Sequence, residues 1–173
     1  MAAAILAPLS IVGAVLHIAA HAVGKITLFF AAGSIYTAAH KTEISQLNGI
    51  GRKMPWTMGA FAVASLSMIG IPPTVGFISK WYILMGAIQS EQVFAIAVII
   101  LSTLLNAGYF VPIIYCSFFK TAGNNDDVNQ VKNDHGEAPL PIVIALTITA
   151  AGTVILFFLS DLPLGLAKLM VNF

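Results

Sequence analysis

The sequence predicts an all-α protein, a polytopic bundle of transmembrane helices in which one helix is discontinuous. Hydrophobic residues make up 58% of the chain and charged residues only 9%, whereas soluble domains are roughly 25% charged. The apolar residues gather in four blocks, each long enough for the ~20 residues that span a bilayer. One block is interrupted at its middle by two adjacent prolines, Pro72 and Pro73. A continuous helix does not pass through such a pair, because both backbone donors are lost and the rings clash with the preceding turn.

The first apolar block begins near Ile5, and we predict a span over residues 9–36. Pro8 separates this span from the end of a preceding helix. The N-terminal segment has no basic region and no small-residue cleavage site after its apolar run. It is therefore interpreted as part of the structure and not as a signal peptide.

The second block, residues 56–90, is too long for one straight span. Its halves are each ~15 residues, or roughly 22 Å of helix, which is too short to cross a ~30 Å hydrocarbon core alone. We therefore predict one broken span and not a hairpin of two spans. The break covers residues 70–76 and contains Gly70, Pro72, Pro73 and Gly76.

The third and fourth spans are predicted over residues 92–119 and 139–159, which makes residues 1–173 a single transmembrane domain. With one broken span, the polar loops 40–55 and 120–138 fall on the same side of the membrane. That side holds five basic residues and the other side holds one, Lys168; the five are Lys41, Arg52, Lys53, Lys120 and Lys132. The positive-inside rule makes the loops cytoplasmic and places the C-terminus outside.

A ladder of titratable residues lies within the first span. His17, His21 and Lys25 are spaced by four residues, so they form one stripe along a helix. Titratable groups one turn apart, bridged by water, suit a proton relay, and charged residues inside membranes usually mark such routes. Two alternatives are that the histidines bond to neighbouring helices, or that the pair shares a metal ion.

Lys80 lies in an apolar half-span just past the helix break. Broken helices free backbone groups at membrane depth, and transporters place ion sites at such interruptions. We expect Lys80 to serve the same proton relay, close to the positive N-terminal end of the half-helix that starts near Gly76. The alternative is a lysine whose amine reaches the membrane interface.

The remaining chemistry-bearing patterns are absent from the sequence. There is no nucleotide-binding loop, no Ser/His/Asp constellation and no Cys-rich metal motif, and the net charge of +1 gives no basic bias toward nucleic acid. We therefore expect no cofactor, no structural or catalytic metal and no nucleic-acid partner. The chain is expected to act as a transporter subunit and not as an enzyme.

Three segments resemble the proton-conducting antiporter family, over roughly residues 5 to 120. They are His17-x3-His21-Ala22-x2-Lys25-x2-Leu28-Phe29-x3-Gly33, Ile44-x2-Leu47-x-Gly49-x-Gly51-x2-Met54-Pro55, and Leu66-Ser67-x2-Gly70-Ile71-Pro72-Pro73-x2-Gly76-Phe77-x-Ser79-Lys80-Trp81. This family comprises Mrp-type Na⁺/H⁺ antiporter subunits, the homologous membrane-arm subunits of respiratory complex I, and related hydrogenase subunits. Residues 24–30 and 54–57 are most similar to the D branch of the Mrp-type antiporter subunits.

The resemblance implies an inverted-repeat transporter fold of fourteen helices, with a broken helix in each five-helix repeat. Lys25 matches the family's central connecting lysine and Lys80 the terminal lysine on the second broken helix. The implied function is that of a monovalent cation (Na⁺)/proton antiporter subunit in the bacterial inner membrane, with other subunits, protons, cations and lipid as partners. The alternative is a proton-pumping, non-catalytic membrane subunit of a redox complex such as NADH:quinone oxidoreductase or a membrane-bound hydrogenase.

The sequence departs from the family pattern at its start. Family members carry a first repeat with a glutamate and lysine pair, whereas this sequence begins at what would be the late second repeat. We therefore expect a C-terminal portion: a fragment, a split gene product or a truncated gene model. By itself such a chain would not complete a pathway, and a non-conducting assembly role is a third hypothesis.

Overall fold

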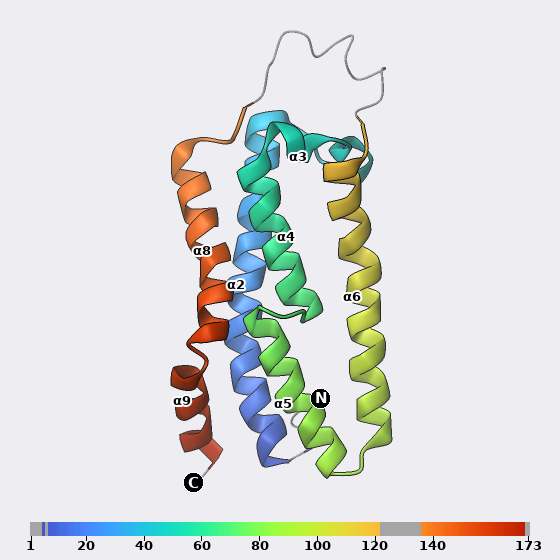
Figure 1. Ribbon diagram of the computed structural model, residues 1–173, viewed down its shortest axis with the longest axis vertical. Helices are drawn as coiled ribbons and strands as arrows, with labels where there is room; N and C mark the ends of the chain where they lie inside the picture. Colours follow the sequence, from blue (N-terminus) through green and yellow to red (C-terminus); the bar gives the residue numbers. More distant parts are fainter. Residues whose placement is uncertain (1–4, 6, 122–135, 172–173) are drawn as a thin grey trace.

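The computed structural model describes residue 5, residues 7–121 and residues 136–171, and within these ranges the chain forms helices and no strands. The elements in order are α2 (Pro8–Ala39), the 3₁₀ helix η1 (Ile44–Leu47), α3 (Ile50–Lys53), α4 (Pro55–Ile69), α5 (Val75–Gln89), α6 (Val93–Phe119), α8 (Leu140–Phe158) and α9 (Asp161–Val171). Figure 1 shows the long helices side by side, and the predicted all-α bundle with one broken helix is confirmed.

Three of these helices, α2, α6 and α8, are long and apolar enough to cross a membrane. Helix α2 has 32 residues and starts with Pro8 in its first turn, where a missing backbone N–H leaves no hydrogen bond unmade. Many large apolar side chains of α6 and α8 face outward; Phe94, Leu105 and Leu140, for example, are 83%, 66% and 71% exposed. Such surfaces suit a hydrocarbon environment or a partner helix and not water.

The broken helix consists of α4 and α5, with 15 residues each. They follow one another along α2 in Figure 1, joined by a short connection. Helix α4 ends because Gly70 takes a left-handed conformation with φ of +88°, which only glycine adopts at no steric cost. The Pro72–Pro73 peptide bond in the connection is cis.

The break is shorter than the sequence predicted, because Gly76 belongs to the first turn of α5. A Cβ at this position would overlap the backbone carbonyl of Ser67 in α4. Gly76 is therefore needed for the close approach of the two half-helices and not for the interruption itself.

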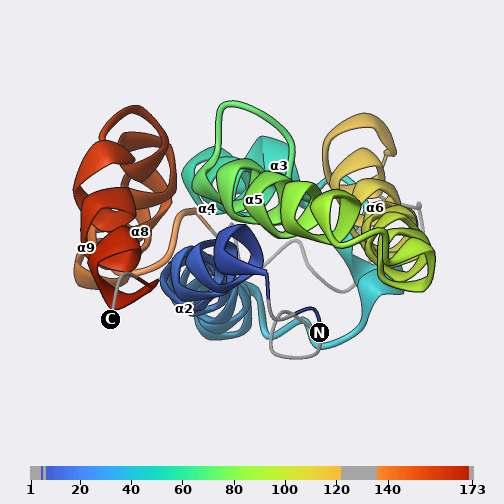
Figure 2. The same ribbon diagram turned by 90° about the horizontal axis from the view of Figure 1, so that it is seen from below.

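Helix α2 packs along both half-helices, with α8 and α9 on one side and α6 on the other, as Figure 2 shows from below. The contact between α2 and α5 is close because small residues meet there. A Cβ on Gly86 of α5 would lie 2.6 Å from the backbone nitrogen of Ser10 in α2. Without a hydrophobic driving force between helices in lipid, such close packing is a main source of association.

The ends of α2, α4, α6 and α8 meet at one end of the bundle. There the backbone N–H of Gly49 donates to the carbonyl of Cys116 in α6, at 3.1 Å. The Glu137 carboxylate accepts hydrogen bonds from the Trp56 N–H at 2.7 Å and from the Thr57 hydroxyl at 2.7 Å. The segment before α8 thus caps the N-terminus of α4, which has no cap of its own.

Candidate functional site at the helix break

The side chain of Lys80 connects the two halves of the broken helix. From the second turn of α5 its amine donates to the carbonyl oxygens of Met68 at 3.0 Å and Ile69 at 2.8 Å, both in the last turn of α4. A third, longer contact of 3.4 Å reaches the Thr103 hydroxyl on α6. Thr103 donates its own proton to Ile99, so its oxygen is free to accept. The three N–H donors of an ammonium group thus have three oxygen acceptors.

These contacts add to one expectation from the sequence. The sequence predicts Lys80 close to the positive N-terminal end of α5, and in the structure its amine also reaches the carbonyl end of α4. The last carbonyls of a helix have no partner within the helix and carry partial negative charge. The break therefore presents acceptors to Lys80, and all three are neutral oxygens.

Gly70 shapes the space through which Lys80 reaches these carbonyls. A Cβ on Gly70 would lie 2.8 Å from the Cδ of Lys80, well inside van der Waals contact. The same glycine that ends α4 thus leaves room for the lysine stem beside the helix end.

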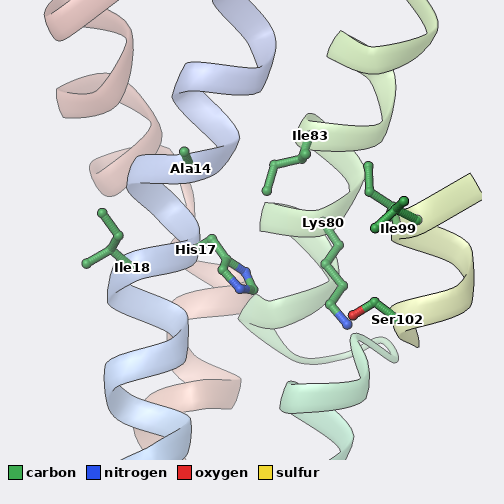
Figure 3. Close-up of a pocket in the computed structure, with 8 residues that line it drawn as sticks. Ala14, His17, Ile18, Lys80, Ile83, Ile99 and Ser102 are labelled. Carbon is green, nitrogen blue, oxygen red and sulfur yellow. The ribbon is translucent and has the colours of Figure 1, made fainter. Parts of the chain in front are cut away.

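His17 shares a cavity with Lys80. The cavity lies between α2, α5 and α6, has a volume of about 360 Å³ and is lined by both residues and by Ser102, with apolar side chains around them. Figure 3 shows the His17 ring and the Lys80 side chain extending into this space from facing helices. Its volume exceeds many times the roughly 30 Å³ that one water occupies in the liquid.

A second cavity of about 280 Å³ adjoins Lys80 at the break itself, between α5 and α6. It is lined by Gly70, Thr103 and mainly apolar side chains, including Phe77 and Trp81. Lys80 is therefore the titratable residue common to both cavities.

The remaining members of the predicted ladder lie farther along α2. The His17 and His21 rings have centroids 5.6 Å apart and are tilted by 34°, so the two rings are neighbours, as their spacing predicted. Lys25 is exposed on α2 and lines neither of the two cavities at Lys80. The structure thus brings His17 and Lys80 together and leaves Lys25 apart from them.

Sequence reasoning missed the hydroxyl residues of the site. Ser79 is fully buried and its Oγ lies 3.0 Å from Nδ1 of His17. Thr103 and Ser102 come from α6, more than twenty residues away in sequence. Ser79 was within reach of sequence analysis as the neighbour of Lys80, whereas the α6 residues carry no signal before the helices are packed.

Metal binding by a histidine pair finds no further ligand among the described residues. No three His, Cys, Asp or Glu side chains gather anywhere in that part of the chain. The two histidines are followed along α2 by a lysine, which as an ammonium has no lone pair to offer.

Comparison with known proteins gives a family match over residues 1–106, to the transmembrane family described as NADH:quinone oxidoreductase/Mrp antiporter. The matched part contains both half-helices and the four relay residues predicted from sequence.

Two curated relatives illustrate the likeness. NADH-quinone oxidoreductase subunit N of Desulforudis audaxviator (strain MP104C) is 45% identical over 112 residues, which cover 65% of this chain and 22% of the relative. The D subunit of the Na(+)/H(+) antiporter of Alkalihalophilus pseudofirmus is 31% identical over 142 residues, covering 81% of this chain and 28% of the relative. The chain thus spans about a quarter of the length of these relatives.

Among solved structures, a chain of the Mrp complex from Dietzia sp. DQ12-45-1b superposes with a TM-score of 0.85 at 19% identity. The match covers 98% of this chain and 39% of the other chain. At this identity the likeness concerns the fold, and the fold of the described helices agrees with a segment of a larger membrane protein.

Proposed function

We infer that this chain, which belongs to the NADH:quinone oxidoreductase/Mrp antiporter transmembrane family, forms part of a monovalent cation (Na⁺)/proton antiporter subunit. In this proposal His17, His21, Lys25 and Lys80 provide a proton relay within the membrane. Both the relative named as an antiporter subunit and the matched Mrp complex support this choice.

The observation that carries the proposal is the position of Lys80 between two cavities. Its amine lies at the helix break, with carbonyl acceptors on one side and the His17 cavity on another. A group in this position can release a proton toward either cavity if water fills them, because each cavity contacts the same side chain. Polar and ionisable groups of this kind inside membranes normally mark an ion pathway.

A second candidate function is that of a redox-driven proton pump subunit. The relative that is 45% identical bears the name of an NADH-quinone oxidoreductase subunit. The same lysines and histidines would then move protons when driven by electron transfer in another subunit, and this chain would be non-catalytic.

Integral membrane location follows from the three apolar spanning helices and the family match. We place the chain in a bacterial inner membrane, with the η1–α3 end of the bundle cytoplasmic and α9 outside. Lys41, Arg52 and Lys53 lie at the first end and Lys168 in α9, in the sense of the positive-inside rule. Other subunits of a membrane complex, protons and monovalent cations are the proposed partners.

The proposal is tested by Lys80→Ala and Lys25→Ala in the complete native complex, in everted membrane vesicles. We expect each change to abolish the dissipation of ΔpH that Na⁺ addition causes, followed as acridine orange dequenching. Lys168→Ala is the matched control, because this lysine is exposed on α9 and away from both cavities. Wild-type dequenching in both test variants would contradict the relay.

The redox alternative can be distinguished from the antiporter by the subunits that copurify with the chain. Copurification with quinone-reducing or hydrogenase subunits, and proton pumping that is sensitive to rotenone or piericidin, would establish the second function. Na⁺-dependent exchange without such subunits would establish the first.

A further inference from the structure

The imidazole of His17 is held from α5 by a single hydroxyl group. Nδ1 of His17 and Oγ of Ser79 are 3.0 Å apart, and Ser79 is 0% exposed. This contact joins two helices across 62 positions of sequence, so it fixes the ring of His17 relative to the half-helix that carries Lys80.

The direction of this hydrogen bond follows from the second partner of Ser79. Its Oγ also lies 3.0 Å from the carbonyl oxygen of Gly76, and a carbonyl only accepts. If the hydroxyl proton pointed to His17, two lone-pair-bearing oxygens would face each other at 3.0 Å with no proton between them. The proton of Ser79 therefore goes to Gly76, and the ring of His17 must donate to Ser79 through Nδ1–H.

A neutral imidazole that carries its proton on Nδ1 has its lone pair on Nε2. The His17 ring extends into the cavity that Lys80 also lines (Figure 3). A proton taken up at Nε2 makes an imidazolium whose Nδ1–H still donates to Ser79, and loss of the same proton restores the starting state. The path through Ser79 is a dead end, because it terminates at the Gly76 carbonyl.

We propose that Ser79 is a positioning residue that holds neutral His17 in its Nδ1–H tautomer, so that Nε2 alone exchanges protons with the Lys80 cavity. The proposal rests on the proposed proton relay and adds to it the nitrogen that His17 uses. Ser79 moves no proton itself and acts only through the ring it orients.

The test reads the tautomer directly. In the complete complex, with histidine labelled by ¹⁵N, reconstituted in lipid and held at alkaline pH, the ring-nitrogen shifts show which nitrogen of His17 carries the proton. His17→Gln identifies the signal. We expect Nδ1–H in the wild type, and in Ser79→Ala a shift toward the Nε2–H form.

Two further variants make the test specific. Ser79→Thr keeps the hydroxyl and should restore the Nδ1–H signal; if it does not assemble, Ser79→Cys should give an intermediate spectrum. Ser34→Ala is the matched control. Ser34 is also a fully buried serine, but it lies on α2 and its Oγ has no hydrogen-bond partner within the described residues. This change should leave the spectrum unchanged. In vesicles, Ser79→Ala should slow proton exchange roughly two- to tenfold, which is the effect of one lost hydrogen bond.

Two results would overturn the proposal: an Nε2–H signal in the wild type, or an unchanged tautomer in an assembled Ser79→Ala protein. Neither depends on transport, so the proton relay itself would still be judged by the Lys80 variants. Conversely, wild-type transport in both Lys80→Ala and Lys25→Ala would refute the relay and leave the tautomer result standing.

Discussion

At the scale of single residues, the site depends on how oxygen atoms surround one lysine. Lys80 reaches two carbonyls at the end of α4 and one hydroxyl on α6. The stem that carries the amine passes Gly70. Small changes beside this stem should therefore act on the position of the amine as well as on stability.

Gly70→Ala tests this dependence. We expect a loss of roughly 1–2 kcal/mol in stability from the left-handed conformation at φ +88°, together with slower Na⁺-induced dissipation of ΔpH, because the new Cβ displaces Lys80. Thermal stability is measured as the monodisperse fraction that remains after heating in detergent, and transport as dequenching. The matched control is Gly59→Ala in α4, where a Cβ meets nothing within 4 Å; equal losses in both variants would contradict the argument.

Also at the scale of residues, the sequence was informative where an ionisable side chain lies within an apolar segment. Lys80 and the histidines could be predicted because ionisable groups are rare in apolar spans. Thr103 could not be singled out, and Ser79 only as the neighbour of Lys80, since hydroxyl groups in helices routinely bond to their own preceding carbonyls, as both do here. Their additional contacts with His17 and Lys80 arise only when three helices pack together.

At the scale of elements, the N-terminus of α4 depends on a residue that is distant in sequence. Helix α4 begins at the bundle end without a side-chain cap of its own. Glu137 supplies the acceptor from 81 positions away. A carboxylate at this end also opposes the positive end of the helix dipole.

Removal of this cap should loosen α4. We expect Glu137→Ala to lower the stability by about 1 kcal/mol, seen as a lower midpoint of thermal unfolding in detergent. Glu137→Gln should lose less, because an amide oxygen still accepts from the Trp56 N–H. If Glu137→Ala melts at the wild-type temperature, the cap does not stabilise α4.

The long helices and the break between α4 and α5 could be predicted from the length of the apolar blocks and the position of the prolines. Apolar blocks of spanning length predict the long helices and the Pro72–Pro73 pair predicts the break, because backbone hydrogen bonds must be satisfied within each helix in lipid. The role of Gly76 was not predictable: it has the character of a helix breaker in sequence, but serves the contact with Ser67 in the structure. Likewise, the direction of the Lys80 side chain depends on the turn between the half-helices.

At the scale of the whole molecule, the bundle separates its charges. The η1–α3 end carries Lys41, Arg52 and Lys53, whereas the opposite end carries Lys168 in α9. A membrane with cytoplasmic positive charge would orient the chain by this difference.

This orientation is checked by labelling with a membrane-impermeant maleimide, after the single cysteine is replaced by Cys116→Ser. We expect Ser45→Cys to be labelled in everted vesicles, where the cytoplasmic face is outward, and Lys168→Cys only in right-side-out vesicles. Both residues are exposed. Labelling of both sites from the same face would contradict the arrangement with one broken span.

The hydrogen bonds at the two ends of α4 have a mechanical consequence. The helix has 15 residues and is roughly 22 Å long. Its N-terminal end donates to the Glu137 carboxylate and its C-terminal carbonyls accept from the Lys80 ammonium group. A shift of α4 along its axis would lengthen the hydrogen bonds at one of its two ends. In the proposed relay, loss of the Lys80 proton would weaken the hydrogen bonds to the last carbonyls of α4 while those to Glu137 remain. Proton release at Lys80 would thus alter the hydrogen bonds at Glu137, at the opposite end of α4.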